Sequence, residues 1–321
     1  MTLIEAERST TAGAFWAIGA VFCFTGNDVL VKFLAGDYPL YELMFVRSIT
    51  GILFVLGVVV PLTGTFSMLK TRRLPIHILR GFCVIFANFC FFLGLAALPL
   101  ADAVAIFFIS PMLISLLSIL FLGESVGPRR WVAIAVGFIG VLIVLRPGTT
   151  SFQMASILPL IAACGYAMLH ILTRRIGGTE NATAMVFYIQ STFFVVACVA
   201  GLGLGHGRFD VYDHPSLHFL LQGWNWPNAF DLSLMVALGI ISSSGGFMIS
   251  EAYRKSEAAL VAPFEYVAMP LAVFWGLAVF GELPDLIAWA GIGLIMASGL
   301  TLIWREAVAR RQSNFFSPKR L

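Results

Sequence analysis

Residues Leu93–Gly148 read LGLAALPLADAVAIFFISPMLISLLSILFLGESVGPRRWVAIAVGFIGVLIVLRPG. Two apolar runs, 102–122 and 128–146, flank a short polar turn that contains Gly123 and Glu124. Each run approaches the ~20 apolar residues that a helix needs to cross a bilayer. The stretch therefore predicts two transmembrane helices joined by a tight hairpin.

Similar runs occupy most of the chain. It has 321 residues, of which 59 % are hydrophobic and 12 % charged, and its mean hydropathy is +0.92. Too little polar surface remains to cover a water-soluble globule, which excludes an ordinary soluble enzyme. The net charge of +3 is too small to suggest nucleic-acid binding. The predicted transmembrane helices are 13–34, 40–60, 76–97, 102–122, 128–146, 153–173, 183–205, 231–252, 257–280 and 285–304.

The basic residues support ten spans. Alternate connections fall on opposite sides of the membrane, and Lys and Arg favour the cytoplasmic side. Only Arg146 and Arg208 fall on the other side, and Lys32, Arg47 and Arg80 lie inside spans. The remaining basic residues share one side: Arg8, Lys70, Arg72, Arg73, Arg129, Arg130, Arg174, Arg175, Arg254, Lys255, Arg305, Arg310, Arg311, Lys319 and Arg320. We therefore expect an all-α membrane protein with both termini in the cytoplasm.

An internal repeat divides the chain. Gly123, Glu124 and Trp131 recur with the same spacing as Gly281, Glu282 and Trp289, an offset of 158 residues. Each half then holds five spans, and because five is odd, the second half enters the membrane from the opposite side. Inverted repeats of this kind are typical of secondary transporters, whose substrate site lies near the midplane between the halves.

The residues Leu93–Gly148, repeated more loosely at Ala252–Trp304, resemble the EamA domain of the drug/metabolite transporter superfamily. The resemblance covers about residues 10–306. It implies a ten-helix bundle around a central cavity, with the fifth and tenth helices peripheral. Because that superfamily includes exporters of amino acids and toxic cations, importers of vitamins and S-adenosylmethionine, and nucleotide-sugar exchangers, it does not specify a substrate.

The expected organisation follows from the repeat. It comprises a cytoplasmic N-terminus at 1–12, a first EamA-like repeat at 13–147, a second at 153–306 with an outer loop at 206–230, and a basic cytoplasmic tail at 307–321. The expected location is a bacterial inner membrane, since only four of the 20 basic residues are Lys.

Charged groups inside spans indicate the site, because each costs roughly 2.5–3.5 kcal/mol on insertion scales. Arg47 and Glu265 come from opposite halves, and both approach the midplane. We expect Arg47 to bind an anionic group of a substrate, and Glu265 to bind a cationic group or carry a coupled proton. The alternative is that the two residues pair with each other and lock the bundle.

A second polar cluster contains Asn27, Asp28 and Lys32 in the first helix. Asp28 and Lys32 are four residues apart, so they share a helix face and can form an ion pair. Lys32 can also reach the outer surface. Asp28 lies deeper, where a carboxylate could face the cavity or carry a coupled proton.

Other groups complete the candidate site. Hydrogen-bonding side chains in apolar spans are expected to contribute to substrate binding: Asn88, Tyr166, Tyr188, Gln190 and Tyr266. The run that includes Ser244 and Gly245 either packs closely against another helix or breaks beside the cavity. Pro111 and Pro270 are expected to kink their helices and act as hinges.

These features predict a secondary active transporter that moves a small polar or amphipathic metabolite by alternating access, by proton coupling or exchange. An amino acid, an S-adenosylmethionine-like compound or another organic zwitterion or anion is the expected substrate. The alternative is a lipid flippase or an enzyme that acts on a lipid-linked phosphate through Arg47 and Arg80. No nucleotide-binding fingerprint or clear metal-ligand spacing is present, so no cofactor or metal is predicted. The expected partners are the substrate and the bilayer, and homodimerisation stays open.

Overall fold

The computed structural model describes residues 3–122, 128–149, 153–176, 180–211, 213–255 and 264–316. In these ranges every regular element is a helix, and there is no strand. The polar turn at Gly123 and Glu124 lies outside the described residues. The expectation of an all-α protein is therefore confirmed for the described chain.

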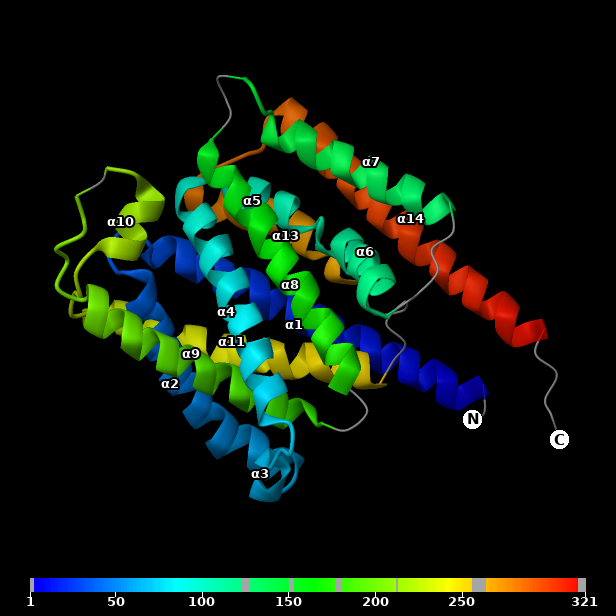
Figure 1. The fold of residues 1–321 in the computed structure, drawn as a ribbon, viewed down its shortest axis with the longest axis horizontal. Coiled ribbons are helices and arrows are strands. Elements are labelled where there is room, and N and C mark those ends of the chain that lie inside the picture. Colours follow the sequence, from blue (N-terminus) through cyan, green and yellow to red (C-terminus); the bar gives the residue numbers. More distant parts are fainter. Residues whose placement is uncertain are drawn as a thin grey trace.

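The long helices follow the predicted apolar runs (Figure 1). Their bounds are α1 Leu3–Leu34, α2 Leu40–Phe54, α3 Val60–Thr63, α4 Leu74–Ala97, α5 Leu100–Phe107, α6 Ser110–Leu122, α7 Pro128–Leu145, α8 Ile157–Ile176, α9 Ala182–Leu204, α10 Pro215–Leu221, α11 Ala229–Lys255, α13 Ala268–Phe280 and α14 Leu286–Phe316. One π-helical turn, η1 Val55–Val59, joins α2 to α3, and two short 3₁₀ turns are η2 Phe66–Leu69 and η3 Met154–Ser156.

Six helical segments are long and apolar enough to cross a membrane: Phe15–Leu34, Leu40–Thr63, Leu74–Ala97, Met154–Thr173, Ala182–Leu204 and Ala229–Ala252. Four shorter apolar helices lie at Leu100–Ile114, Trp131–Leu145, Ala268–Phe280 and Leu286–Thr301. Each segment falls on one of the predicted runs. The ten-span inverted repeat stays a prediction.

Two of the shorter segments are interrupted near a proline. Between α5 and α6 the helix breaks at Phe108 and Ile109, directly before Ser110 and Pro111. A turn at Tyr266 and Val267 likewise precedes α13, which carries Pro270. Proline has no backbone N–H and is tolerated in the first turn of a helix, so the place of Pro111 and Pro270 in the first turns of α6 and α13 fits helices that restart here. The kinks predicted from Pro111 and Pro270 are present as breaks.

Small residues allow close helix packing. α11 continues without a break through Ser242–Gly246 and packs along α1 and α2. A Cβ atom at Gly245 would lie 2.9 Å from Cβ of Cys23 in α1. α7 and α14 lie side by side (Figure 1), and a Cβ at Gly140 would lie 3.0 Å from the Gly291 carbonyl oxygen. The run that includes Ser244 and Gly245 thus serves close packing in this structure.

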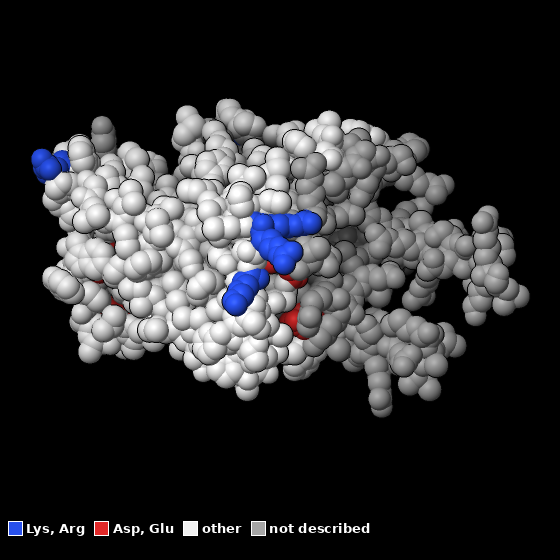
Figure 2. All heavy atoms as spheres, turned by 60° about the horizontal axis from the view of Figure 1, so that its bottom comes forward, with Lys and Arg blue, Asp and Glu red and all other residues white. Residues whose placement is uncertain are grey.

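The outer surface of the bundle is apolar. Phe15, Leu53 and Leu202 are 77 %, 64 % and 86 % exposed. Figure 2 shows one face on which Lys and Arg side chains gather mainly near the centre, beside a few acidic ones, while most of the remaining described surface carries no charge. Such a surface is stable only against lipid.

The start of α1 and the end of α14 lie on the same side of the molecule, and α10 lies on the opposite side (Figure 1). We call the end with both termini the inner end and the end with α10 the outer end, after the topology that the basic residues predict.

The contact between α2 and α11 gives a first prediction. A Cβ atom at Gly239 would lie 2.5 Å from Cβ of Thr50 and 2.6 Å from the carbonyl oxygen of Arg47. Gly239→Ala must push α11 away from α2, and overpacking of this kind costs about 1–3 kcal/mol. We expect a lower thermal unfolding midpoint in detergent.

Gly293→Ala is the matched control, because no atom lies within 4 Å of its added Cβ. A midpoint for Gly239→Ala equal to that of Gly293→Ala would show that α2 and α11 are not closely packed.

Candidate functional site

Arg47 lies in α2 with its side chain enclosed by other helices. The residue is only 7 % exposed. Its guanidinium carbon lies 4.8 Å from the ring centroid of Phe193 and 6.0 Å from that of Phe92. One terminal nitrogen donates to the sulfur of Met44 at 3.8 Å, whereas Nε has no hydrogen-bond acceptor. A buried cation with an unused donor is costly unless an anion comes to it.

Asp28 supplies the charge that acts on Arg47. Its carboxylate accepts a hydrogen bond from the Asn27 amide at 3.2 Å, and its negative charge attracts the Arg47 guanidinium. Asp28 keeps partial exposure although it lies deep in α1. The carboxylate that acts on Arg47 is thus on α1 of the same half, and the pairing of Arg47 with Glu265 stays a prediction.

Lys32 does not pair with Asp28, so that expected helix-face ion pair is wrong. Its ammonium group contacts both carboxylate oxygens of Glu282, at 2.7 and 2.9 Å, and donates to the Leu98 carbonyl at 2.7 Å. Glu282 also accepts a hydrogen bond from the Leu100 amide at 3.2 Å. Lys32 reaches this partner because the end of α1 lies beside the start of α5 and the end of α13. Lys32 and Glu282 therefore connect α1, α5 and α13 at the outer end.

A second ion pair lies on the same connection. Arg146, directly after α7, bonds to Asp285, directly before α14. The Arg146 guanidinium holds the pKa of the Asp285 carboxyl below its usual range. Asp285 is 56 % exposed at its side chain, so water screens this pair more than the one at Glu282, which is 33 % exposed.

Glu265 and Tyr266 lie where the helix breaks before α13. Glu265 lies close enough to interact electrostatically with both Tyr166 and Tyr266. The Tyr266 ring contacts Phe108, at the break between α5 and α6, with centroids 5.2 Å apart. The two helix breaks therefore meet. The Tyr266 hydroxyl lies against Gly299 of α14, where an added Cβ atom would clash with it. This hydroxyl has no hydrogen-bond partner.

Tyr166 and Asn88 lie on facing helices, α8 and α4. Tyr166 contacts Phe107 and His170, with ring centroids 5.2 and 4.5 Å away. The Asn88 amide donates to the Val84 carbonyl of its own helix at 3.0 Å. Both side chains remain partly exposed.

Gln190 and Tyr188 of α9 have structural partners. The Gln190 amide donates to Ser243 at 2.7 Å and to Ser242 at 3.3 Å, which joins α9 to α11. The Tyr188 hydroxyl donates to the Leu69 carbonyl at 2.8 Å, and its ring lies 4.7 Å from that of His77. Tyr188 therefore belongs to the inner end and is separate from the groups around Arg47.

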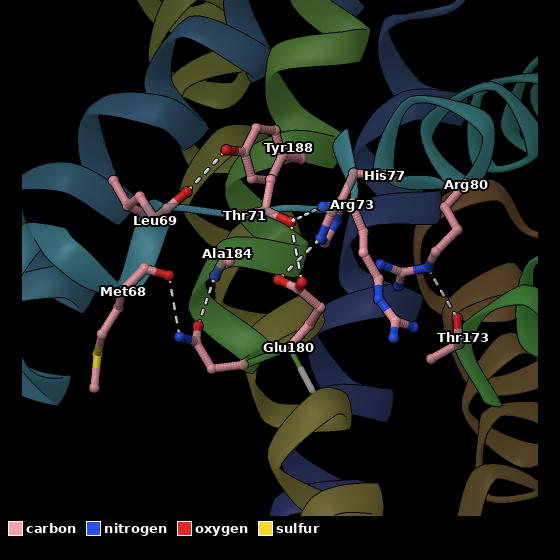
Figure 3. Close-up of polar contacts among 11 residues, drawn as sticks. Met68, Leu69, Thr71, Arg73, His77, Arg80, Thr173, Glu180, Ala184 and Tyr188 are labelled. Carbon is pink, nitrogen blue, oxygen red and sulfur yellow. Dashed lines mark hydrogen bonds and ion pairs between the residues drawn. The ribbon is translucent and has the colours of Figure 1, made fainter. Parts of the chain in front are cut away.

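The inner end contains a polar cluster that the sequence did not single out as a unit (Figure 3). Glu180 accepts a hydrogen bond from Thr71 at 3.0 Å, and its other oxygen lies 3.2 Å from Nε2 of His77. Arg80 donates to Thr173 at 3.1 Å. The available signal was the pair His77 and Arg80, three residues apart in an apolar run, but nothing in the sequence identified their partners.

The outer end has its own bonds between the two halves. Tyr38 donates to Asp231 at 2.7 Å, and Tyr41 to the Gln222 carbonyl at 2.8 Å. The carboxylate of Glu42 accepts from the Asn225 amide at 3.1 Å. In the loop above, His214 caps α10, and His218 lies 2.9 Å from Asp210.

The two ion pairs at the outer end give a second prediction. Glu282→Gln removes the partner of Lys32, which is 11 % exposed, so we expect a loss of about 1–2 kcal/mol in unfolding free energy. Asp285→Asn removes the more exposed pair and should cost less than Glu282→Gln does, because water screens it. Chemical denaturation in detergent measures both. Equal losses of unfolding free energy in the two variants would contradict a larger stabilising contribution from Glu282.

Comparison with known proteins gives a consistent result. Residues 11–146 match the model of the EamA-like transporter family. The chain is 28 % identical over 309 residues to an S-adenosylmethionine uptake transporter of Rickettsia felis, covering 95 % of this chain and 97 % of the relative. It is 26 % identical to a riboflavin transporter of Vibrio cholerae, with coverages of 94 % and 96 %, and 27 % identical to a pseudopaline exporter of Pseudomonas aeruginosa, with coverages of 91 % and 95 %.

One solved crystal structure has the same fold. It superposes with a TM-score of 0.62 at 18 % sequence identity and covers 94 % of this chain and 99 % of its own. The resemblance to the drug/metabolite transporter superfamily is confirmed. Residues 11–146 thus resemble an EamA-like transporter domain, and the chain, which is similar along nearly all its length to bacterial transporters, is a multi-pass protein of the bacterial inner membrane.

Proposed function

We propose that the protein is a secondary transporter that moves a small organic zwitterion or anion across the membrane by alternating access. Arg47 is the observation that carries this proposal. Its guanidinium is buried between the helices, its Nε has no acceptor, and the Asp28 carboxylate attracts it. An incoming carboxylate or phosphate supplies the missing acceptor.

S-adenosylmethionine is the first substrate to test, because one group of relatives is named for its uptake. That compound carries one carboxylate and two cationic centres, an ammonium and a sulfonium. In the proposed site the carboxylate binds Arg47, and the cationic centres lie near Asp28 and Glu265. Tyr166 and Asn88 are proposed as direct contacts, since both keep exposed surface. Gln190, Tyr188 and Tyr266 are proposed to act by holding the surrounding helices.

The same proposal includes ten spans, two inverted repeats and termini in the cytoplasm. The polar contacts agree with that topology. Lys32 bonds to Glu282, and Arg146 bonds to Asp285, which join residues assigned to the outer side. Thr71 bonds to Glu180, which joins residues assigned to the inner side. Helix breaks at Phe108 and Tyr266, in corresponding places of the two halves, further support the repeat, as broken helices mark the substrate site in many transporters.

Alternating access needs two sets of contacts between the halves that open in turn. The described structure has one set at each end, with Tyr38–Asp231 and Lys32–Glu282 at the outer end and Thr71–Glu180 at the inner end. Pro111 and Pro270 are proposed as hinges, because the helices break beside them. Ser244 and Gly245 are proposed to let α11 slide against α1, since bulky side chains there would lock the contact.

The alternative function, a flippase or enzyme for a lipid-linked phosphate, needs Arg47 and Arg80 to bind one phosphate. Arg80 donates to Thr173 and interacts with Glu180 at the inner end, whereas Arg47 interacts with Asp28. The two arginines have different partners, so the transporter has more support.

A third prediction tests the site. A ligand stabilises the folded protein in proportion to its occupancy, so at 100 times its Kd it adds about 2.7 kcal/mol. We expect S-adenosylmethionine to raise the thermal midpoint of the parent protein, and Arg47→Gln to abolish that rise. Arg208→Gln, at the exposed outer loop, is the matched control and should leave the rise intact.

Uptake of the labelled compound into proteoliposomes tests transport itself. Saturable uptake that Arg47→Gln abolishes supports the proposal. Stabilisation of the parent and of Arg47→Gln to the same extent would show that Arg47 is structural.

A further inference from the structure

At the inner end, one carboxylate from the second half of the chain contacts two residues of the first half. Glu180 lies directly before α9, and its side chain is only 9 % exposed. Both of its oxygens are used by residues of the first half: Thr71 donates to one at 3.0 Å, and the other lies 3.2 Å from His77 Nε2. Figure 3 shows Glu180 between these two side chains.

Further bonds around Glu180 join the same two segments. Asn181 donates to the Met68 carbonyl at 3.1 Å while its side-chain oxygen caps α9 by accepting from Ala184. The Tyr188 hydroxyl donates to the Leu69 carbonyl at 2.8 Å. The 66–73 connection is therefore held against the start of α9 by several bonds, and the charged one is at Glu180.

Some buried polar atoms of this cluster have no hydrogen-bond partner. Neither ring nitrogen of His77 makes a hydrogen bond, although Nε2 lies 3.2 Å from Glu180, and one terminal nitrogen of Arg80 is also buried without a hydrogen-bond partner. Arg80 lies close enough to interact electrostatically with Glu180. Because unused donors remain beside a carboxylate, a second arrangement, in which Glu180 leaves His77 for Arg80 or for water, costs less than it would in a saturated network.

One face of α8 connects this cluster to the candidate substrate site. Tyr166, His170 and Thr173 are spaced four and three residues apart, so they lie on the same side of the helix. Tyr166 interacts with Glu265, its ring contacts His170 at 4.5 Å, and Thr173 holds Arg80. Any shift of α8 at Tyr166 therefore reaches Arg80 through Thr173.

We propose that Glu180 is the latch of an inner gate, which closes the path between the halves by binding Thr71 and His77. A substrate that binds beside Tyr166 shifts α8, Arg80 moves with Thr173, and Glu180 is drawn away from the first half. The gate rests on the proposed transporter function, and it assigns to Glu180, His77 and Thr71 a role separate from substrate binding.

Cys83 provides a substrate-free test. It lies one turn deeper than Arg80 on α4 and interacts with it electrostatically, and its carbonyl oxygen faces Gly165 of α8. The protein with Cys83 as its sole cysteine is placed in oriented vesicles, and a charged, membrane-impermeant methanethiosulfonate is added from the inner side. Glu180→Ala removes the hydrogen bond from Thr71 and the contact with His77, and it should raise the rate of Cys83 labelling about tenfold, a typical size for coupling between sites. Glu180→Gln, which keeps the shape and one acceptor, should give a smaller rise.

Asp210→Asn is the matched control, since Asp210 also pairs with a histidine, His218, but within one loop of the second half. Its labelling rate should equal that of the parent. Unchanged labelling in both Glu180 variants, an equal rise in Asp210→Asn, or an equal rise from the outer side would overturn the latch. Uptake of S-adenosylmethionine fails or succeeds independently of this labelling, so the two proposals are tested separately.

Discussion

The cost of placing a charge in an apolar interior governs this structure. Several charged groups have a partner at one end of the bundle: Lys32 has Glu282, Glu42 has the Asn225 amide, and Glu180 has Thr71 and His77. Arg47 is buried among the helices, its Nε lacks an acceptor, and the Asp28 carboxylate attracts it. A cation kept in an apolar interior at this cost indicates function.

The two helix breaks lie beside charged groups, and the same constraint on polar groups in a membrane applies to both. An unbroken helix satisfies its own backbone, so a break inside a membrane is tolerated only where protein or water surrounds it. Phe108 and Tyr266 cover each other at the two breaks, and Glu265 lies beside them. At the outer end Glu282 holds the start of α5 and the end of α13 together through Leu100. The two broken helices are thus connected to each other both at their breaks and at the outer end.

Composition and periodicity predicted the helices well, because a bilayer demands long apolar runs. The prolines predicted where two of these runs would break. Ion pairs between distant segments were not predictable in the same way. The four-residue spacing suggested a pair of Asp28 with Lys32, but Lys32 pairs with Glu282 because the end of α13 lies beside it. The inner cluster was missed for the same reason, since Thr71, His77 and Glu180 are ordinary residues until α4 and α9 bring them together. Gln190 was predicted as a ligand, and the bond from its amide to Ser243 is revealed only by the packing of α9 on α11.

The central claim is that the groups in the middle of the bundle face a path that opens to each side in turn. Asn88→Cys in an otherwise cysteine-free chain tests this directly, because Asn88 is partly exposed and its amide donates within its own helix, so the substitution breaks no bond between helices. The account predicts that an impermeant thiol reagent labels Cys at this position from either side of oriented vesicles, and that substrate slows labelling from both. Labelling from neither side would place these groups in a sealed core and would contradict the account.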